Sequence, residues 1–542
     1  MSKVATYLQQ HILGEVSAQP AVLDAMSRDA SVLEIKPEMV IYPKTTNDIR
    51  KVARFSWQLA EKGHVLPITA RGSGTDQTGA AIGSGIVLAF PAHMNNIFEF
   101  EPKQKLVRVQ PGMNAKAFND ALRLHGVTIP SFPASASYST VGGAVANNAT
   151  GTRAGRYGDM RSWVGQLEVV LANGEVLQTG RISKRELNKK KGLQTFEGEI
   201  YRSLDNLIED NAELIVTKLS SPIRDNVGYS SLADVKHKDG SFDLTPLFIG
   251  SQGTLGIISE MIMRTEFVSL NTTTIAATFS SKETARDALD IMLRVEPAIL
   301  EYIDGEIFDV AAKYGKTYDF LPEGSIANGA VVILSLDDFS ERARARKVRK
   351  ILRELGADTQ VTVAEGEEAS ELLDAIEVTS YSIMPTGKDE SAPPLFDGAY
   401  IPAERFEDFS RSVAVLAQRY HVALPLHGHV IDSTYSTRPI LQFKKVSDKQ
   451  KIFKLLDEYA GLLDQFDGHL IGQSAEGRVK ARFAYEYVDD EAVSLFTSVK
   501  AIFDPFGILN TGVKQPHELK QLVAILRSNY DNASLADYLP YN

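Results

Sequence analysis

The chain has 542 residues, of which 44% are hydrophobic and 23% charged, a composition typical of a globular protein with room for several domains. Its net charge of −11 argues against a surface that binds nucleic acid. The absence of cysteine excludes disulfides, thiolate metal sites, iron–sulfur clusters held by cysteine and a catalytic thiol, so redox chemistry would need an organic cofactor or a metal bound by His and carboxylate groups.

The predicted elements alternate between strands and helices along most of the chain. A helical arm is expected over residues 1–36, followed by strands at 39–42, 65–69, 85–89, 106–110, 167–171, 175–178, 257–263, 273–279 and 331–336, and helices at 47–62, 115–125, 196–219, 281–294, 340–355 and 490–502. Asn173-Gly174 predicts the tight turn of a hairpin. Residues 130–158 are poor in large apolar side chains and are predicted to form one long loop.

No segment of the chain has the features of a membrane signal. Residues 1–19 lack the charged start and apolar core of a signal peptide, and no run of 18 apolar residues occurs. We therefore expect a cytoplasmic protein without a transmembrane segment. Residues 516–530 carry apolar side chains at helical spacing, which would suit peripheral contact with the inner membrane face, although docking on the protein's own surface explains them better.

Three loops rich in small residues are the main functional signal. The first, residues 71–79, reads Arg-Gly-Ser-Gly-Thr-Asp-Gln-Thr-Gly directly after a predicted strand. Glycines let the backbone turn and approach a ligand, and successive N–H groups can bind a pyrophosphate, although a tight structural turn explains this loop equally well. Residues 133–151 and 250–256 add hydroxyl, amide and backbone donors, so the three loops could line one elongated ligand. Neither the spacing of a Rossmann fingerprint nor the Gly-Lys-Ser/Thr of a P-loop is present.

These motifs, in this order, resemble the FAD-binding superfamily of vanillyl-alcohol oxidase and p-cresol methylhydroxylase. Within it the chain is similar to the branch of D-lactate dehydrogenases and glycolate oxidase flavoprotein subunits. The resemblance covers about residues 38–514. Further matching segments are Arg156-Tyr157-Gly158-Asp159, residues 169–174, Asn226-Val227-Gly228-Tyr229, Phe503-Asp504-Pro505 and Ile508-Leu509-Asn510.

The resemblance implies an α+β fold in which a two-part FAD-binding domain of the p-cresol methylhydroxylase (PCMH) type is followed by a ferredoxin-like α+β cap domain and a C-terminal segment that returns to the FAD domain. The predicted division is an N-terminal arm at 1–37, the FAD-binding domain at 38–267, the cap or substrate domain at 268–470, the returning segment at 471–514 and a tail at 515–542.

The resemblance also implies the cofactor and its binding residues. Some branches attach the flavin through a histidine beside the first loop, but this position reads Gly74-Thr75-Asp76, so non-covalent FAD is expected. The residues implied to bind it are Arg71, Gly72, Ser73, Gly74, Thr75, Asp76, Pro133, Ala134, Ser135, Thr140, Gly142, Gly143, Asn148, Gly151, Gly256 and Ile257.

The cap motifs depart from the hydroxy-acid branch, which supplies metal ligands and a base from two histidines around Asp-Gly-Asn and from a second motif, Glu-His-Gly. His429 remains, but Ser436 stands where the second histidine is expected, and Gln473 and Ser474 replace the Glu-His pair. The arginine expected near residue 376 to hold a carboxylate is also absent. Because hydroxyls and an amide replace the ligands, no metal site is predicted.

The remaining catalytic candidates are His429, His427 and Arg438. Alternate positions on a strand would put both histidines on one face, although a pair of structural histidines is an equal alternative. Arg438 would hold an anionic substrate or, as an alternative, stabilise the fold.

The resemblance implies an FAD-dependent dehydrogenase that transfers hydride from a small organic substrate, such as D-lactate or another 2-hydroxy acid, to FAD and on to a quinone, cytochrome, redox protein or oxygen. The alternative is a flavin-carrying electron-transfer subunit without hydroxy-acid activity of its own. A homodimer is left open.

Overall fold

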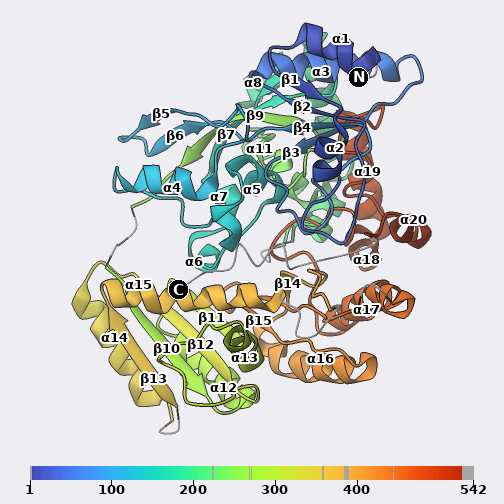
Figure 1. The fold of residues 1–542 in the computed structure, drawn as a ribbon. Coiled ribbons are helices and arrows are strands. Elements are labelled where there is room, and N and C mark those ends of the chain that lie inside the picture. Colours follow the sequence, from blue (N-terminus) through green and yellow to red (C-terminus); the bar gives the residue numbers. More distant parts are fainter. Residues whose placement is uncertain are drawn as a thin grey trace. The chain divides into compact units, whose positions relative to one another are not determined.

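The computed structural model describes residues 3–221, 225–267, 269, 271–356, 359–383, 390–442 and 445–527 (Figure 1). The chain divides into two compact units. Of the described residues, the first unit holds those up to 150 together with 159–266 and 473–527, and the second holds 151–158 and 267–472. Within the described residues, the chain therefore crosses from one unit to the other four times.

Two sheets form the framework of the first unit. The strands of the first sheet, in the order β1-β2-β4-β3, are β1 (Glu15–Ser17), β2 (Met39–Tyr42), β4 (Ile86–Ala89) and β3 (Ile68–Arg71). β4 runs parallel to both β2 and β3. The second sheet is antiparallel, and its strands, in the order β5-β6-β9-β7-β8, are β5 (Ile97–Glu101), β6 (Leu106–Val109), β9 (Ile257–Arg264), β7 (Val164–Val170) and β8 (Val176–Gln178).

The helices of the first unit come from all three of its stretches of chain. They are α1 (Lys3–His11), α2 (Pro20–Met26), α3 (Thr46–Ala60), α4 (Ala115–Arg123), η1 (Ala134–Ser137), α5 (Val141–Asn147), α7 (Met160–Trp163), α8 (Lys184–Lys191), α9 (Phe196–Asp210), α10 (Ala212–Leu214), η2 (Ile215–Leu219), η3 (Ser230–Asp234), α11 (Thr245–Phe248), α18 (Ala481–Tyr485), α19 (Asp490–Phe503) and α20 (Leu519–Ala524).

Helix α3 illustrates how the sequence builds this unit. Thr45 caps its start, because Thr45 Oγ1 accepts a 3.3 Å hydrogen bond from the Asp48 N–H. Ile49, Val52 and Ala53 follow at helical spacing and are fully buried. They share one apolar cluster with residues of β2, β3 and β4, so α3 covers the first sheet.

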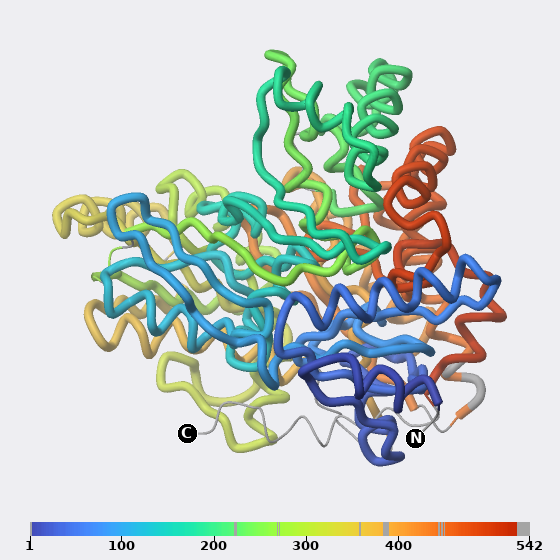
Figure 2. Tube along the Cα trace, turned by 90° about the horizontal axis from the view of Figure 1, so that it is seen from above, coloured from blue at the N-terminus to red at the C-terminus, as the bar shows by residue number. Residues whose placement is uncertain are grey.

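The C-terminal residues of this unit complete the first sheet. The Ile68 N–H donates to the Ile508 carbonyl at 2.7 Å, and the Asn510 N–H donates to the Ile68 carbonyl at 2.8 Å. Figure 2 shows the red C-terminal trace beside the blue N-terminal trace of the unit. Residues more than 400 positions apart in sequence therefore meet at the start of β3.

The second unit is built on one antiparallel sheet of seven strands. In the order β13-β10-β12-β11-β15-β16-β14, they are β13 (Gln360–Glu365), β10 (Thr273–Phe279), β12 (Ala330–Leu336), β11 (Ile299–Asp304), β15 (His427–His429), β16 (Thr434–Ser436) and β14 (Ala399–Tyr400). The helices are α6 (Ala154–Tyr157), α12 (Lys282–Leu293), α13 (Gly305–Lys313), α14 (Glu341–Glu354), α15 (Glu367–Asp374), η4 (Ala375–Ile383), η5 (Ala403–Arg405), α16 (Phe406–Tyr420) and α17 (Val446–Gln465).

One face of this sheet carries a core that includes Ile303, Val331 and Ile333. Ile307 and Phe308 of α13 belong to the same cluster, as do residues of α15 and η4, so these helices cover that face of β11 and β12.

Residues 151–158 group with the second unit, and one buried carboxylate makes several of their contacts to it. The Asp337 side chain is only 1% exposed, and the Tyr157 hydroxyl donates to it. The guanidinium groups of Arg153 and Arg156 lie 3.5 and 3.7 Å from its oxygens. Burial, followed by the hydrogen bond to Asp337, raises the pKa of Tyr157 to about 12.

Most of the predicted strands and helices are present with small shifts of their ends, but three predictions are wrong. Residues 1–36 do not form one helical arm, because β1 separates α1 from α2 and no helix follows α2 up to residue 36. Residues 130–158 are not one loop, because η1, α5 and α6 lie within them. The strand predicted at 65–69 begins only at Ile68, and Val65 is 56% exposed. The prediction also missed β5, whose residues are mostly exposed and lack the alternation of a half-buried strand.

Candidate functional site

The first glycine loop leaves β3 and turns at once. Gly74 has a φ of +81°, which favours glycine, and a Cβ on Gly72 would lie 2.3 Å from Thr140 Oγ1. Among the described residues, none accepts a hydrogen bond from the backbone N–H groups of Gly72, Ser73, Gly74 and Thr75. Four consecutive donors without a protein partner would suit an anion such as a phosphate group, and the role of this loop in FAD binding stays a prediction.

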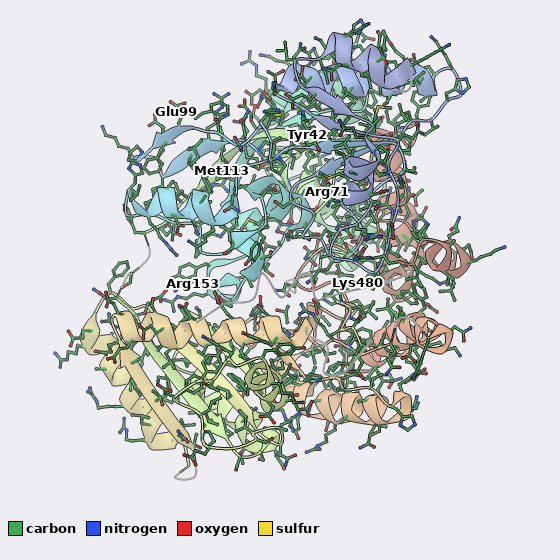
Figure 3. The ribbon with its side chains drawn as sticks, in the orientation of Figure 1. Tyr42, Arg71, Glu99, Met113, Arg153 and Lys480 are labelled. Atoms are coloured by element: carbon green, nitrogen blue, oxygen red, sulfur yellow. The ribbon has the colours of Figure 1, made fainter. Side chains whose placement is uncertain are left out.

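The two charged side chains of this loop bond to protein groups. The Arg71 guanidinium, labelled in Figure 3, donates to the carbonyls of Ala81 at 3.0 Å and Arg28 at 2.8 Å. Asp76 accepts a 2.9 Å hydrogen bond from the Thr78 N–H. Burial lowers the pKa of Arg71 and raises the pKa of Asp76. Both side chains stabilise the conformation of the loop, and their role as FAD ligands stays a prediction.

Helix α5 begins in the second small-residue segment, but its first N–H groups already have partners. Thr140 Oγ1 accepts from the Gly143 N–H at 3.1 Å, and the N–H groups of Val141 and Gly142 donate to main-chain carbonyls. The start of α5 is therefore closed to an anion, unlike the first loop. A Cβ on Gly142 would lie 2.4 Å from Pro111 Cβ, so this glycine permits close packing.

The other residues predicted to bind FAD are spread over both units. Pro133 precedes η1, which contains Ala134 and Ser135. Gly151 groups with the second unit. Gly256 packs on β7, where a Cβ would lie 2.4 Å from Val169 Cγ1, and Ile257 is 1% exposed at the start of β9. Their contribution to FAD binding also stays a prediction.

Gln252 joins the three predicted loops of the first unit. Its Nε2 donates to Asn147 Oδ1 at 2.8 Å and to Thr78 Oγ1 at 3.3 Å. Its Oε1 accepts from the Gly477 N–H at 3.0 Å, and its carbonyl accepts from Asn510 Nδ2 at 2.7 Å. Gln252 has a φ of +53°, a strained value for this residue, and this strain is offset by the hydrogen bonds to four other segments. The three loops therefore converge on one place, as the proposal of one elongated ligand requires.

A buried amide cluster lies next to this meeting point. Asn148 Nδ2 donates to Asp159 Oδ2 at 2.8 Å and to Asn226 Oδ1 at 2.7 Å, and Arg161 Nη2 donates to the same Asn226 oxygen at 3.1 Å. Within the described part of the chain, three buried atoms of this cluster have no hydrogen-bond partner: Asn148 Oδ1, Asn226 Nδ2 and Arg161 Nε. We refer to these three residues as the amide cluster.

A fully buried ion pair supports the amide cluster. Lys514 Nζ lies 2.6 Å from Glu476 Oε2, and both side chains have no exposed surface. Lys514 also donates to the Asn226 carbonyl at 3.2 Å, while Glu476 accepts from the Gly228 N–H at 2.8 Å and the Tyr485 hydroxyl at 2.9 Å. Burial lowers the pKa of Lys514, and the charge of the adjacent Glu476 acts against this shift.

In the second unit, the strand β15 carries the two predicted histidines on one face. In the pairing of β11 with β15, Glu301 lies opposite His429 and Ile303 opposite His427. His429 Nδ1 lies 2.6 Å from Glu301 Oε1, and the Glu301 side chain is only 2% exposed. Burial raises the pKa of Glu301, and His429 opposes this shift.

The surroundings of His427 and Arg438 differ from those of a positively charged site that binds an anionic substrate. Burial, followed by the nearby Arg438 charge, lowers the pKa of His427 to about 3, so its imidazole is neutral at pH 7. Arg438 makes a bidentate contact with Asp397, with Nη2 at 2.7 Å from Oδ2, and donates from Nη1 to Ser382 Oγ at 2.9 Å. Its guanidinium is therefore already engaged by protein groups.

The residues at the altered motif positions also bond to protein groups. Ser436 Oγ accepts from the Gly398 N–H at 2.9 Å. Gln473 Nε2 donates to the Thr150 carbonyl at 3.3 Å. In the described ranges, no group of three or more His, Cys, Asp or Glu residues is placed to hold a metal ion.

Two known protein families match this chain. The family described as "FAD binding domain" matches residues 37–180, and the family described as "FAD linked oxidases, C-terminal domain" matches residues 270–513. The chain belongs to the FAD-linked oxidases. The predicted PCMH-type α+β fold and FAD as the cofactor are confirmed.

Relatives of this FAD-linked oxidase include enzymes named for 2-hydroxy acids. It is 27% identical to a D-2-hydroxyglutarate dehydrogenase of Pseudomonas putida over 92% of the chain and 50% of that protein. It is 26% identical to the glycolate oxidase subunit GlcD of Bacillus subtilis over 88% of each chain. The chain thus spans about half the length of the D-2-hydroxyglutarate dehydrogenases it matches. A solved structure of p-cresol methylhydroxylase shares the fold, with a TM-score of 0.68 and 14% identity over 94% of this chain and 96% of that one.

The first unit of this FAD-linked oxidase fits the cofactor. The N–H groups of residues 72–75 supply partnerless donors suited to a pyrophosphate, and the buried partnerless atoms of the amide cluster require a polar ligand or water. These two groups of residues would hold FAD. The sequence predicted Asn148 among the residues that bind FAD, but not Asn226, Arg161 or Gln252. These side chains come together from separate segments of the chain, and the motifs around them do not indicate which ones are in contact.

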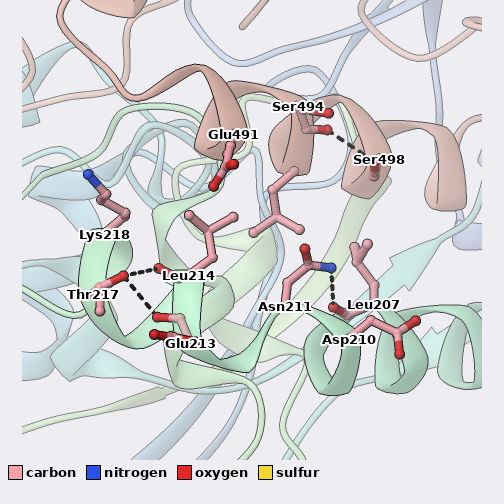
Figure 4. A pocket seen from close by; sticks show the side chains of 11 residues that line it. Leu207, Asp210, Asn211, Glu213, Leu214, Thr217, Lys218, Glu491, Ser494 and Ser498 are labelled. Atoms are coloured by element: carbon pink, nitrogen blue, oxygen red, sulfur yellow. Dashed lines mark hydrogen bonds between the residues drawn. The ribbon is translucent and has the colours of Figure 1, made fainter.

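The first unit also has a surface cavity of about 590 Å³, shown in Figure 4, between η2 and the helices α9, α10 and α19. Asp210, Glu213, Lys218 and Glu491 line it, and Lys218 forms a 2.9 Å ion pair with Asp489. It contains none of the predicted site residues, and its charged side chains are typical of a solvated surface.

Proposed function

We propose that the chain is a dehydrogenase with non-covalent FAD that oxidises the CH–OH group of a 2-hydroxy acid. The names of its relatives support this substrate class, and the loop at 72–75 supports the cofactor. The observation on which the catalytic part of the proposal depends is the 2.6 Å contact between His429 Nδ1 and the buried Glu301 carboxylate.

Oxidation of an alcohol to a carbonyl removes a hydride from carbon and a proton from oxygen. Bound FAD supplies the acceptor for the hydride. The proton needs a base beside the hydroxyl group, and a metal could otherwise lower the pKa of that group. Because the expected metal ligands are replaced by Ser436 and Gln473, we assign the proton to a protein base.

His429 is the proposed base, and Glu301 is a positioning residue. When Nδ1–H of His429 donates to Glu301, the tautomer with its lone pair on Nε2 is favoured. The Glu301 carboxylate also stabilises the imidazolium that forms when His429 takes the proton, as a buried carboxylate does in other acid–base pairs. Glu301 lies 128 residues before His429, and only the register of β11 with β15 brings the two together.

His427 and Arg438 receive smaller roles. A neutral His427 can donate or accept one hydrogen bond to a substrate but cannot pair with its carboxylate as a cation. Arg438 is engaged by Asp397, so we assign it to the structure of the site and not to substrate binding. Of the two alternatives left open by the sequence, we therefore propose that Arg438 stabilises the fold.

The test is anaerobic reduction of the FAD-loaded protein by D-2-hydroxyglutarate, D-lactate and glycolate, followed by flavin absorbance. We expect one or more of these acids to bleach the flavin bands. His429→Asn should slow bleaching by at least about 100-fold, whereas His421→Asn, at an exposed helix end with a φ of +52°, should not change it. Flavin that no hydroxy acid reduces, but a redox partner does, would favour the electron-transfer subunit instead.

We further propose a cytoplasmic location, an electron acceptor that is a quinone, a cytochrome or a redox protein, and the domain division given above. Among the helices described, none is long and apolar enough to span a membrane. Leu522 of α20 is fully buried and Leu526 pairs with Leu33, which favours docking of the tail on the protein over membrane contact. Fractionation and gel filtration would test location and the homodimer.

A further inference from the structure

We propose that the amide cluster of Asn148, Asn226 and Arg161 binds the imide edge of the flavin ring, that is, its C2 carbonyl, N3–H and C4 carbonyl. The proposal rests on FAD as the family's cofactor and does not depend on the substrate. It assigns three side chains of this chain to the flavin ring. The glycine loop at 72–75 offers only N–H donors, so it cannot accept a hydrogen bond from the N3–H group of that ring.

The orientation of the two amides is fixed by their neighbours. Asn148 Nδ2 faces two oxygens, Asp159 Oδ2 at 2.8 Å and Asn226 Oδ1 at 2.7 Å, so a flipped amide would place oxygen against oxygen. Asn226 Oδ1 accepts from both Asn148 Nδ2 and Arg161 Nη2, which fixes the second amide in the same way. The partnerless atoms are therefore an oxygen on Asn148 and a nitrogen on Asn226.

The partnerless atoms form a specific set of two donors and one acceptor. Asn226 Nδ2 and Arg161 Nε donate, and Asn148 Oδ1 accepts. The three groups are linked through the single oxygen Asn226 Oδ1, so they are neighbours. An imide edge presents the complementary set of two carbonyl acceptors and one N–H donor. A carboxylate offers only acceptors and would leave Asn148 Oδ1 facing another oxygen, so the cluster does not suit the substrate acid.

Burial makes an empty cluster costly. Asn148 is 0% and Asn226 3% exposed, and a buried polar group without a partner loses the hydrogen bonds it made to water in the unfolded chain. The ion pair of Lys514 and Glu476 holds the Asn226 backbone through its carbonyl, so the cluster has little freedom to rearrange toward other partners.

The cluster also lies next to the place where the small-residue loops meet. Asn148 follows Asn147, which bonds to Gln252, and a Cβ on Gly250 would lie 3.3 Å from Asn148 Cβ. Asn148 itself has a φ of +46° at the end of α5, a conformation that asparagine tolerates better than most residues. The backbone at this point therefore places the Asn148 amide beside the third loop.

The experiment compares the affinity of the apoprotein for FAD and for 3-methyl-FAD, in which the N3–H donor is lost. Wild type should bind 3-methyl-FAD about tenfold more weakly, because Asn148 Oδ1 loses its partner. In Asn148→Ala, FAD should bind about tenfold more weakly and the preference over 3-methyl-FAD should disappear. Asn211→Ala, which alters an amide between the end of α9 and the start of α10, should keep both the affinity and the preference of wild type.

Arg161→Lys provides a second variant that keeps the charge but removes Nε, should Asn148→Ala fail to fold. It should weaken both cofactors equally, keep the preference for FAD and shift the flavin absorption bands, since a hydrogen bond to a ring carbonyl is lost. The proposal is overturned if wild type binds both cofactors equally, if Asn148→Ala keeps the full preference, or if Arg161→Lys leaves affinity and spectrum unchanged. None of these results depends on oxidation of a hydroxy acid, so they are separate from a failure of the proposed activity.

Discussion

The buried pair of Lys514 and Glu476 gives a quantitative prediction. Glu476→Gln keeps the shape of the side chain and its contacts with Gly228 and Tyr485, but it removes the charge opposite Lys514. Both side chains are fully buried, so the ammonium would be left without a counter-ion. Breaking a buried pair from one side costs about 3–5 kcal/mol. At about 2–4 °C for each kcal/mol, we expect the Tm to fall by roughly 10 °C.

The assay is thermal and urea unfolding of the FAD-free protein, followed by circular dichroism so that cofactor affinity does not enter. The double variant Glu476→Gln/Lys514→Met removes both charges, and we expect it to recover a Tm above that of Glu476→Gln, because no uncompensated charge remains. A Glu476→Gln protein within about 1 kcal/mol of wild type, or a double variant less stable than either single variant, would refute this reasoning.

Three further predictions concern the two sites. Gly74→Ala should abolish FAD binding, whereas Gly63→Ala should not. Both glycines have a φ of +81°, but only at Gly74 would a Cβ meet another group, Arg71 Nη2 at 2.2 Å. Flavin titration of both variants therefore separates the effect of backbone strain from the effect of the steric clash. Glu301→Gln should slow flavin reduction by about tenfold or more without changing flavin affinity, measured by anaerobic stopped flow, and an unchanged rate would remove Glu301 from the proposed mechanism. The free energy of unfolding should fall as the pH drops from about 6.5 toward 3. The pKa of His427 is about 3 in the folded protein, so only the unfolded chain binds the extra proton in that range. The urea midpoints at pH 7 and pH 5 should therefore differ less in His427→Gln than in wild type.

The parts of this protein that depend on local sequence were predictable. The helix at α3 and the hairpin of β7 and β8 follow from apolar spacing and from Asn173-Gly174. Helix α5 was missed because Gly142 and Gly143 lower its intrinsic propensity, which the Thr140 cap and close packing on Pro111 help to offset.

The parts that depend on distant pairing were not predictable from one sequence. The contact of Glu301 with His429 needs the register of two strands more than 120 residues apart, which no local pattern specifies. Gln252 gave no signal as a residue that joins the loops, because its role comes from Thr78, Asn147 and Asn510 in three other segments. The first glycine loop was found because its function lies in consecutive backbone groups.

The short excursion of residues 151–158 into the second unit affects how this protein can be divided. A fragment cut at 267 and 472 would contain Asp337 but neither Tyr157 nor the two arginines beside it. A Cβ on Gly155 would lie 2.6 Å from Ile431 Cβ, so the same fragment would also lose packing two residues from His429. A chimera that exchanges the second unit between relatives should therefore include residues 151–158. Exchange of residues 267–472 alone would separate the Asp337 carboxylate from its partners.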